Sequence, residues 1–428
     1  MSETRNMTLE APSAPQPRRT GGGRNPAALV LNLFYSGLAI ARDLAPHGVR
    51  VIGLSANRKI YGNFSRFCET RFIPDTQESP DDLARVLLDY ASELQGSIIF
   101  PTRDADVLFL DRYREALEPY YCLNIPPRDV LMRVLNKYEL VHAAMRAGVP
   151  VPRTALVSSR AELADVETNV GFPCVLKPVQ SVQWRMGDSW NRVGARKAIQ
   201  ISNPDGLRRE YDLVSAVNEQ VLIQEMIPGP AENIVILGGY VGSDSKPLAV
   251  FTARKLVQTP DDFGTGCVVE AVDIPELHAV TARLFAELEY QGMAEVEYKQ
   301  DSATGEYKLI EINTRHWDWH QLGNASGINV SLAAYSHLAG NAYGPGRVDR
   351  SARACWIGED AFLIYALRNL YWRRVGFRDL LRKIRGHRMY GVFAWNDPIP
   401  FIRYFFSVML PEMASAIFNK IRGGSHQS

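Results

Sequence analysis

The sequence contains few cysteines, and none of them is placed for metal binding or redox chemistry. The five cysteines of the 428 residues lie far apart, and no Cys-x-x-Cys pair occurs. This pattern argues against a disulfide framework and against a structural zinc site. We therefore expect a protein of the reducing cytoplasm.

The chain also lacks an excess of charge of either sign. It has 48 basic and 47 acidic side chains, which leaves a formal net charge of +1. Dedicated nucleic-acid binders are usually strongly basic, and disordered acidic chains have few hydrophobic residues, whereas 46% of this sequence is hydrophobic. The length predicts about two to four globular domains.

No apolar run reaches the roughly 18 residues that span a bilayer. One segment nevertheless resembles a signal peptide, because residues 25–41 carry no charge, follow several arginines and end in Ala-Ile-Ala. The alternative is a strand at 27–31, a turn, and a helix at 38–47. We favour this second interpretation, because the pattern continues without a break into another strand at 49–54.

The remaining pattern divides the chain into four parts. Residues 1–24 are rich in Pro, Ser, Thr, Gly and Arg, which is typical of a disordered leader. Residues 25–125 alternate short apolar runs with helical patterns, which predicts a Rossmann-like, doubly wound α/β domain, although Gly-x-Gly-x-x-Gly is missing. Residues 126–340 are rich in β-type runs and predict an α+β domain with antiparallel sheets, and residues 341–428 predict a small, basic and mostly helical region.

The stretch that carries most chemical information is a predicted β-hairpin near residue 300. Its two strands are Ala294–Lys299 and Tyr307–Arg315. Because residues two apart on a strand share a side, Glu297, Glu311 and Asn313 can point to one face. Carboxylate and amide oxygens are ligands that Mg²⁺ prefers, which makes this face a candidate metal site. Arg315 shares the face of Asn313 and could reach the same phosphate.

Two further segments fit a nucleotide site. Residues 171–178 form a turn followed by a strand that carries Lys177 near its end. Residues 224–229 form a strand running into a turn, with Glu232 just beyond. Each of these polar residues also has an ordinary structural interpretation, such as a surface lysine or a turn residue.

Taken in order, these motifs resemble the ATP-grasp superfamily, whose members include biotin carboxylase, D-alanine–D-alanine ligase and carbamoyl phosphate synthetase. The subgroup it is most similar to is the carboxylate–amine ligases of the predicted-carboligase type. The resemblance covers roughly residues 25–340 and includes the phrase Pro-Thr-Arg-Asp-Ala-Asp at 101–106. It implies an ATP-grasp catalytic domain over 126–340, with ATP lying between two subdomains that meet near 225–230.

The resemblance also implies nucleotide contacts. Lys177 would contact the α- and β-phosphates, and Lys137 resembles an earlier family lysine that also reaches phosphate. The remaining implied contacts are an adenine-reading hinge and a ribose contact: Gln224, Glu225 and Ile227 for the hinge, and Glu232 for the ribose.

The implied catalytic groups lie further along the chain. Glu297, Glu311 and Asn313 match the Mg²⁺ ligands, with Mn²⁺ as the alternative metal. Arg315 matches the arginine that steadies the transferring phosphoryl group. Arg254 and Lys255 look like residues of the substrate side and are assigned to the carboxylate or to the acyl phosphate.

The reaction implied by this family is a two-step ligation. A carboxylate becomes an acyl phosphate, an amine then attacks the acyl carbon, and ADP and phosphate are released. Two other functions stay open: an ATP-grasp phosphotransferase that stops at a phosphorylated product, and a non-catalytic ATP-binding regulator. In the segment 316–320, His-Trp-Asp-Trp-His, a tryptophan stands where biotin carboxylase has an acid, which favours an aromatic-lined acceptor pocket over bicarbonate activation.

The C-terminal region allows two interpretations. From Ser351 onward there are 12 Lys or Arg against 5 Asp or Glu, a net of +7, and residues 398–421 are rich in large apolar side chains. The region is either a helical subdomain packed on the body or a basic amphipathic segment that binds anionic lipid, placing the enzyme peripherally on the inner membrane face. The expected partners are a small carboxylate and an amine, no nucleic acid, and a second copy in a homodimer.

Overall fold

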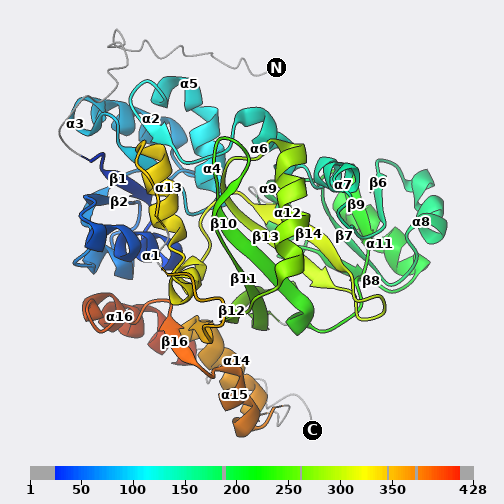
Figure 1. The fold of residues 1–428 in the computed structure, drawn as a ribbon. Helices are drawn as coiled ribbons and strands as arrows, with labels where there is room; N and C mark the ends of the chain where they lie inside the picture. The colour runs from blue at the N-terminus through cyan, green and yellow to red at the C-terminus, as the bar shows by residue number, and fades with distance from the viewer. Residues whose placement is uncertain (1–24, 186–188, 261–262, 345–346, 372–374, 415–428) are drawn as a thin grey trace.

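The computed structural model describes residues 25–185, 189–260, 263–344, 347–371 and 375–414 (Figure 1). The predicted leader at 1–24 and the last fourteen residues of the predicted C-terminal region, 415–428, lie outside the described residues. Three sheets organise the rest: one of five strands, one of four and one of seven.

The first sheet is parallel and has the strand order β3-β2-β1-β4-β5. Its strands are β1 (Ala28–Leu31), β2 (Val51–Ser55), β3 (Glu69–Phe72), β4 (Ile98–Phe100) and β5 (Cys122–Leu123). The helices around it are α1 (Tyr35–Leu44), α2 (Pro80–Asp89), α3 (Ala91–Leu94), α4 (Asp104–Arg112) and α5 (Arg114–Leu117), with short 3-10 turns at Ala45–His47 and Tyr61–Phe64. The predicted strand–turn–helix at the start of the domain is therefore confirmed.

A glycine makes the first strand–helix turn close. A Cβ atom at Gly37 would lie 1.9 Å from the carbonyl oxygen of Asn32, so only glycine fits where α1 begins beside the turn. The helix can then pack directly on the end of β1, the edge where doubly wound sheets present their polar loops.

The second sheet is antiparallel, with the order β6-β9-β7-β8. Two helices, α6 (Arg128–Leu135) and α7 (Lys137–Arg146), lead into it. Its strands are β6 (Thr154–Val157), β7 (Cys174–Pro178), β8 (Ile199–Ile201) and β9 (Val221–Glu225). Its helices are α8 (Leu163–Asn169), α9 (Ser181–Arg185), α10 (Ser189–Arg192) and α11 (Pro204–Ser215), with a 3-10 turn at Arg160–Glu162.

The third sheet has the order β14-β13-β10-β11-β12-β15-β16 and is antiparallel except for its last pair. Its strands are β10 (Ile234–Val241), β11 (Pro247–Thr259), β12 (Thr265–Ala271), β13 (Gly292–Gln300), β14 (Tyr307–Asn313), β15 (Ala354–Ile357) and β16 (His387–Tyr390). The helices α12 (Pro275–Leu288) and α13 (Val330–Leu338) belong to this part, as do 3-10 turns at Ala231–Asn233 and His320–Ser326. The predicted order, a parallel α/β sheet followed by antiparallel sheets, is confirmed.

The C-terminal region contains the predicted helices but is not composed of helices alone. They are α14 (Glu359–Tyr371), α15 (Phe377–Lys383) and α16 (Pro398–Tyr404), and a π-helical turn at Phe405–Met409 follows α16. Strands β15 and β16 belong to this region by sequence, yet β15 pairs with β12 and extends the large sheet. Figure 1 shows α16 beside the N-terminal domain, far from β14.

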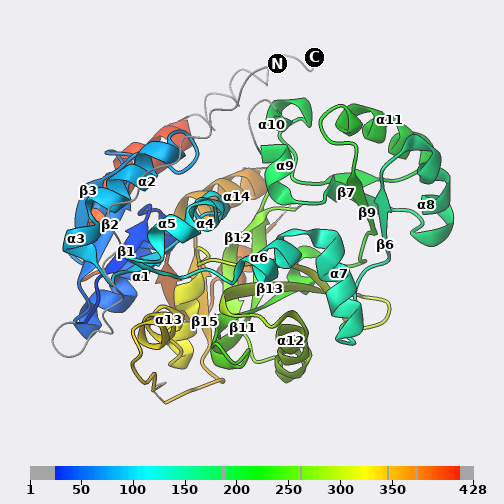
Figure 2. The same ribbon diagram turned by 90° about the horizontal axis from the view of Figure 1, so that it is seen from above.

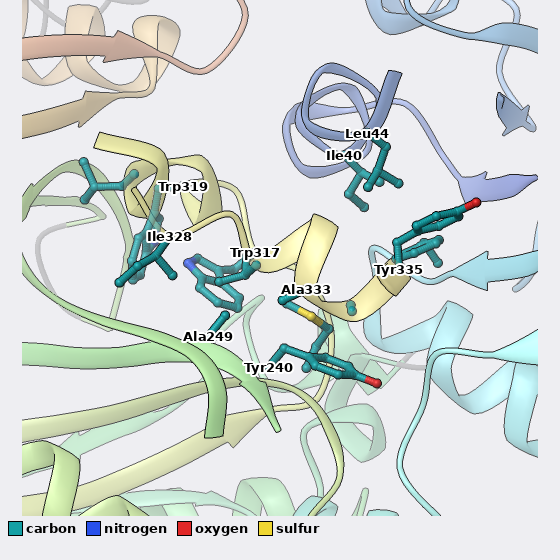
Figure 3. Close-up of a cluster of buried hydrophobic side chains, with 14 of the residues drawn as sticks. Ile40, Leu44, Tyr240, Ala249, Trp317, Trp319, Ile328, Ala333 and Tyr335 are labelled. Carbon is teal, nitrogen blue, oxygen red and sulfur yellow. The ribbon is translucent and has the colours of Figure 1, made fainter. Parts of the chain in front are cut away.

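One hydrophobic core joins the N-terminal domain to the large sheet. Trp317 and Trp319 pack on β10 and β11, while Ile40 and Leu44 of α1 reach the same core past α13, as Figure 3 shows. Both tryptophans are 2% exposed. Since this core crosses between the two sheets, it fixes the segment after Arg315 against both.

Candidate active site

A cavity of about 710 Å³ opens where all three sheets meet. In Figure 2 the three sheets with their helices surround the middle of the molecule, and α9 and α10 lie on the side of the four-stranded sheet. Charged side chains of both signs line the cavity: Arg103, Asp104, Lys137, Lys177, Lys197, Lys255, Glu295, Glu297, Glu311, Arg315 and Asp318. The site residues predicted from the β13–β14 hairpin all lie here.

Strand register brings the hairpin acids together. Glu297 of β13 pairs across the ladder with Glu311 of β14, and Glu295 pairs with Asn313. The register shifts after this pair, so that Ile310 and Glu311 both line the cavity although they are adjacent. A bulge of this kind re-aims side chains next to a site. The amide nitrogen of Asn313 donates to Glu295 at 3.0 Å, which leaves the amide oxygen of Asn313 as a ligand.

Two lysines from different elements converge on this acidic face. Asn136 caps α7 through its side chain, which fixes Lys137 in the first turn of that helix. The ammonium of Lys137 donates to Ser181 at 2.8 Å and lies 3.6 Å from Glu311. Burial opposes the charge of Glu311, yet Lys137 and Lys177 lower the pKa of that carboxyl.

Lys177 is a half-buried cation that Glu311 attracts without forming an ion pair with it. It makes no hydrogen bond or ion pair with any residue that the structure describes. Burial, with repulsion from Lys137 next, lowers the pKa of Lys177 to about 8. An ammonium group held in this way favours an anionic ligand, which would supply a charge to pair with it.

Lys255 faces the cavity from β11, while its neighbour Arg254 does not. The ammonium of Lys255 donates to Glu297 at 2.7 Å. Burial opposes this charge, but the carboxylates of Glu297 and Glu295 raise the pKa of Lys255. Arg254 points to the other side of the strand, where it lies 3.6 Å from Glu270, and it does not line the cavity. The structure therefore brings only one of these two predicted residues to the site.

Arg315 is held by a residue of the N-terminal domain. Its guanidinium donates to Asp104, in the first turn of α4, at 2.6 Å. Burial opposes the charge, but Asp104 raises the pKa of Arg315. In the sequence, Arg103 and Asp104 stand out only as part of the motif at 101–106 that resembles the ATP-grasp family. Nothing in their local pattern indicates that the first domain closes this end of the site.

The predicted hinge residues lie outside the residues that line the cavity. Gln224 is buried and donates to Thr154 at 2.8 Å. Glu225 is held between Lys308 and Arg153, each at 2.6 Å, and although burial opposes it, these cations lower the pKa of Glu225. Ile227 is likewise buried.

Glu232, the predicted ribose contact, is also engaged elsewhere. Its carboxylate accepts from Lys383 of α15 at 2.7 Å, so a residue of the C-terminal region reaches the turn beside the predicted hinge. Sequence patterns gave no sign of this contact, because it joins residues 151 positions apart.

The donor set on the hairpin fits a hard divalent cation. Glu297 and Glu311 present oxygens from facing strands, and Asn313 presents its amide oxygen on the same face. In the part of the chain that the structure describes, no three His, Cys, Asp or Glu side chains stand together as a metal site. Mg²⁺ generally takes one or two carboxylates from the protein and completes its shell with phosphate oxygens and water.

Comparisons with known proteins show what the chain resembles as a whole. No protein-family model matches the chain. It is 24% identical over 329 residues to the D-aspartate ligase of Enterococcus faecium (strain Aus0004), a match that covers 72% of this chain and 76% of the ligase. It is 27% identical over 203 residues to the D-alanine–D-alanine ligase of Ectopseudomonas mendocina (strain ymp), covering 46% of this chain and 59% of that enzyme.

The overall fold also resembles that of solved structures. The biotin carboxylase–beta-gamma-ATP complex from Campylobacter jejuni superimposes with a TM-score of 0.60 at 17% identity, covering 75% of this chain and 72% of that one. The chain is similar in sequence to these two ligases and has an ATP-grasp fold. The predicted resemblance is thereby confirmed, and the cavity lies among the three parts of an ATP-grasp fold.

Proposed function

We propose that this ATP-grasp protein is a ligase that activates a carboxylate as an acyl phosphate and joins it to an amine, with release of ADP and phosphate. One observation carries the proposal: cations from three separate elements converge on a pair of carboxylates in strand register inside one cavity. Phosphoryl transfer depends mainly on positioning and charge neutralisation, which this arrangement supplies.

The proposed nucleotide contacts follow from the charges of the cavity. Lys177 forms no ion pair with a described residue, and we assign it to the α- and β-phosphates, with Lys137 beside it. Glu297, Glu311 and Asn313 hold Mg²⁺, which bridges phosphate oxygens when it is bound. The side chains of the predicted hinge lie outside the cavity. We therefore assign to the hinge residues contacts made by their backbone atoms or with the outer edge of the nucleotide.

Two residues act on the substrate. Arg315, held by Asp104, neutralises the phosphoryl group as it passes to the substrate carboxylate. Lys255 stands beside Glu297 and is placed to hold the carboxylate or the acyl phosphate. The buried Trp317 and Trp319 keep water from the acyl phosphate, which water would otherwise hydrolyse.

The names of the relatives suggest the class of substrate. The two curated relatives are a D-aspartate ligase and a D-alanine–D-alanine ligase, which both act on amino acids. We therefore propose an amino acid as one substrate of this protein, either as the carboxylate that is activated or as the amine that attacks.

The test is a screen of amino acids and other carboxylates for Mg²⁺-dependent ADP release, with and without amines. Hydroxylamine serves as a trap, because it converts an acyl phosphate into a hydroxamate. The ligase predicts a hydroxamate with hydroxylamine and an amide with the true amine. A stable phosphorylated product that needs no amine would instead identify a phosphotransferase, and ATP binding without any ADP release would identify a regulator.

A further inference from the structure

One acid of the cavity differs from the others in having no partner. Asp318 lines the cavity, is half-buried, and makes no hydrogen bond or ion pair with any described residue. Each of the other acids that line the cavity has a partner: Asp104 with Arg315, Glu295 with Asn313, Glu297 with Lys255, and Glu311 with Lys137.

The surroundings of Asp318 make this lack of a partner unfavourable. Its sequence neighbours Trp317 and Trp319 are 2% exposed, and burial raises the pKa of Asp318. Arg315, His320 and Lys197 oppose this shift by attraction, but none of them forms an ion pair with Asp318 and the pKa stays raised. A carboxylate removed from water costs free energy unless a donor or a cation replaces the lost hydration.

We propose that Asp318 binds a substrate ammonium group, an inference that rests on the proposed ligase function. The geometry supports it, because Asp318 follows Arg315 by three residues and lines the same cavity. The ammonium belongs either to the amine that attacks or to the amino acid that is activated. Both have the same chemistry, and kinetics can tell them apart.

The step balances if the ammonium is that of the attacking amine. One proton passes from nitrogen to the Asp318 carboxylate, and the freed lone pair forms the C–N bond with the acyl carbon. The C–O bond to phosphate then breaks, and a second nitrogen proton leaves with the phosphate. If the ammonium is that of the activated amino acid, Asp318 only holds it and no proton moves.

The experiment compares wild type with Asp318→Asn, which keeps the shape and removes the charge. The substrates are the carboxylate and the amine identified by the ADP-release screen. One arm measures the KM of the carboxylate with saturating hydroxylamine, and the other measures the KM of the amine with saturating carboxylate. We expect a rise of about tenfold or more in one of the two KM values, with an unchanged Kd for MgATP. The arm that changes identifies the source of the ammonium.

Two controls keep the outcomes distinct. Asp205→Asn alters an exposed acid on α11 and should leave both KM values unchanged, and Asp318→Glu should restore much of the lost affinity. KM values within twofold of wild type in both arms would overturn the assignment, as would an equal loss of MgATP affinity. Failure of wild type in the screen would instead refute the ligase itself.

A separate observation concerns the C-terminal helical run, residues 398–414. One face packs inward, where Tyr404 and Met409 join Leu38 and Tyr61 in a small core. A second apolar face is exposed; Trp395 lies in the turn just before the helix, and the other members follow at helical spacing. The members of this face are Trp395 (88% exposed), Ile399 (53%), Ile402 (52%), Phe406 (64%) and Leu410 (45%). We call these five residues the apolar stripe.

Unpaired cations lie on the elements beside this stripe. Arg58, Lys59, Arg66 and Arg403 form no ion pair with a residue that the structure describes. The guanidinium of Arg403 lies 4.3 Å from the ring centre of Phe64, which places the helix and the 3-10 turn at 61–64 side by side. The sequence from Ser351 onward carries the net charge of +7 noted above.

We propose that the apolar stripe and these cations bind the surface of an anionic lipid bilayer. Interfacial helices combine a row of large apolar side chains with basic residues in this way. None of the described helices is both long and apolar enough to cross a membrane, so the contact is peripheral. The unpaired cations favour an anionic lipid surface over a second copy of this chain.

The test is co-sedimentation of the full-length protein with vesicles of phosphatidylcholine, alone or with 30% phosphatidylglycerol. We expect binding only to the anionic vesicles, at least tenfold weaker for Ile402→Asp/Phe406→Asp and weaker in high salt. Met145→Asp, which alters an exposed apolar residue on α7, is the matched control. Thermal melting checks that each variant is folded.

Two outcomes would overturn the lipid assignment. Equal binding of the double variant to the vesicles would remove the stripe from the contact. Absence of vesicle binding, together with self-association that the double variant abolishes, would show that the stripe is an interface between copies. Neither result would affect the proposed ligase activity.

Discussion

At the scale of single residues, Lys177 shows how the fold prepares a site for an anion. Its ammonium is half-buried, is repelled by Lys137, and forms no ion pair with a described residue, although Glu311 attracts it. Folding therefore places a charge where water is scarce, and the binding of phosphate would compensate this loss. The same physics predicts how binding depends on pH.

We expect MgATP binding to weaken above pH 8. The pKa of Lys177 in the free protein is lowered to about 8, so the ammonium that binds phosphate is lost as the pH rises through that value. Bound phosphate raises this pKa again, so the Kd should increase by about tenfold per pH unit between the two values. Calorimetric titration from pH 7 to 10 measures it. Lys177→Arg, which stays charged, should flatten the profile, and an unchanged slope in that variant would assign the effect to another group.

The pH dependence of stability has the opposite sign to the pH dependence of MgATP binding. A lysine whose pKa is lowered on folding binds fewer protons in the native state than in the unfolded state between pH 8 and its ordinary value. The free energy of unfolding therefore rises with pH across that window, while MgATP affinity falls. Opposite trends in the two measurements would separate the titration of Lys177 from general alkaline unfolding.

Glu311→Gln is predicted to lower turnover by about a hundredfold or more while the protein stays folded. The substitution keeps the shape but removes one of two carboxylates in strand register, and with it charge that holds the metal against phosphate. Glu306→Gln, an exposed residue of the turn in the same hairpin, is the matched control. Mg²⁺-dependent ADP release measures the effect, and a fully active Glu311→Gln enzyme would contradict the metal assignment.

The residues of the hairpin were predictable, and the reason is the period of the strand. Glu311 and Asn313 are two apart and share a face, as the sequence indicated. The same rule explains why Arg254 and Lys255, which were both predicted to face the substrate, do not both reach the site. Neighbours on a strand point to opposite sides, and only Lys255 lines the cavity. Asp318 carried no such periodic signal, since it lies in a segment without regular structure.

At the scale of elements, long periodic segments were predictable and short edge strands were not. Helices α12 and α13, of 14 and 9 residues, are long enough for a helical pattern to be recognised in the sequence. Strands β15 and β16 were not predicted, since each has four residues and β16 carries charged side chains. Their partner strands lie far away in the sequence, and only tertiary pairing makes these residues strands.

The contact between the C-terminal helix and the N-terminal domain combines a small apolar core with one buried ion pair. Asp397, 2% exposed, lies 3.1 Å from the guanidinium of Arg42 and also accepts from Ser65 at 2.7 Å and from the backbone of Arg66. Its position just before α16 lets it join the helix to α1. Removing the acid would leave the guanidinium of Arg42 buried without a counter-charge.

We therefore expect Asp397→Ala to lower the free energy of unfolding by about 3–5 kcal/mol. Asp379→Ala is the matched control, because Asp379 pairs with Arg382 on the surface of α15, where such a pair contributes at most about 1 kcal/mol. Urea unfolding of both variants gives the comparison. Similar stabilities for the two would show that Asp397 does not hold the helix to the body.

At the scale of the whole molecule, the cavity is assembled from parts that are far apart in the sequence. Asp104 comes from the first domain, Lys177 from the four-stranded sheet, and Glu311 from the seven-stranded sheet. The order of these parts was predictable from the resemblance to the ATP-grasp family. The closure of the site by the first domain was not, because the Asp104–Arg315 contact spans 211 positions and neither residue signals the other.

This assembly predicts that MgATP stabilises the whole chain and that ATP without the metal does so much less. A ligand present at a hundred times its Kd adds about 2.7 kcal/mol to the free energy of unfolding. In the proposed site, the phosphates would contact the lysines of the cavity only when the metal balances the carboxylates of Glu297 and Glu311, which would otherwise repel them. Thermal melting with ATP plus Mg²⁺, and with ATP plus EDTA, measures the difference, and Glu311→Gln should remove most of it. Equal shifts with and without Mg²⁺ would place the nucleotide away from the hairpin.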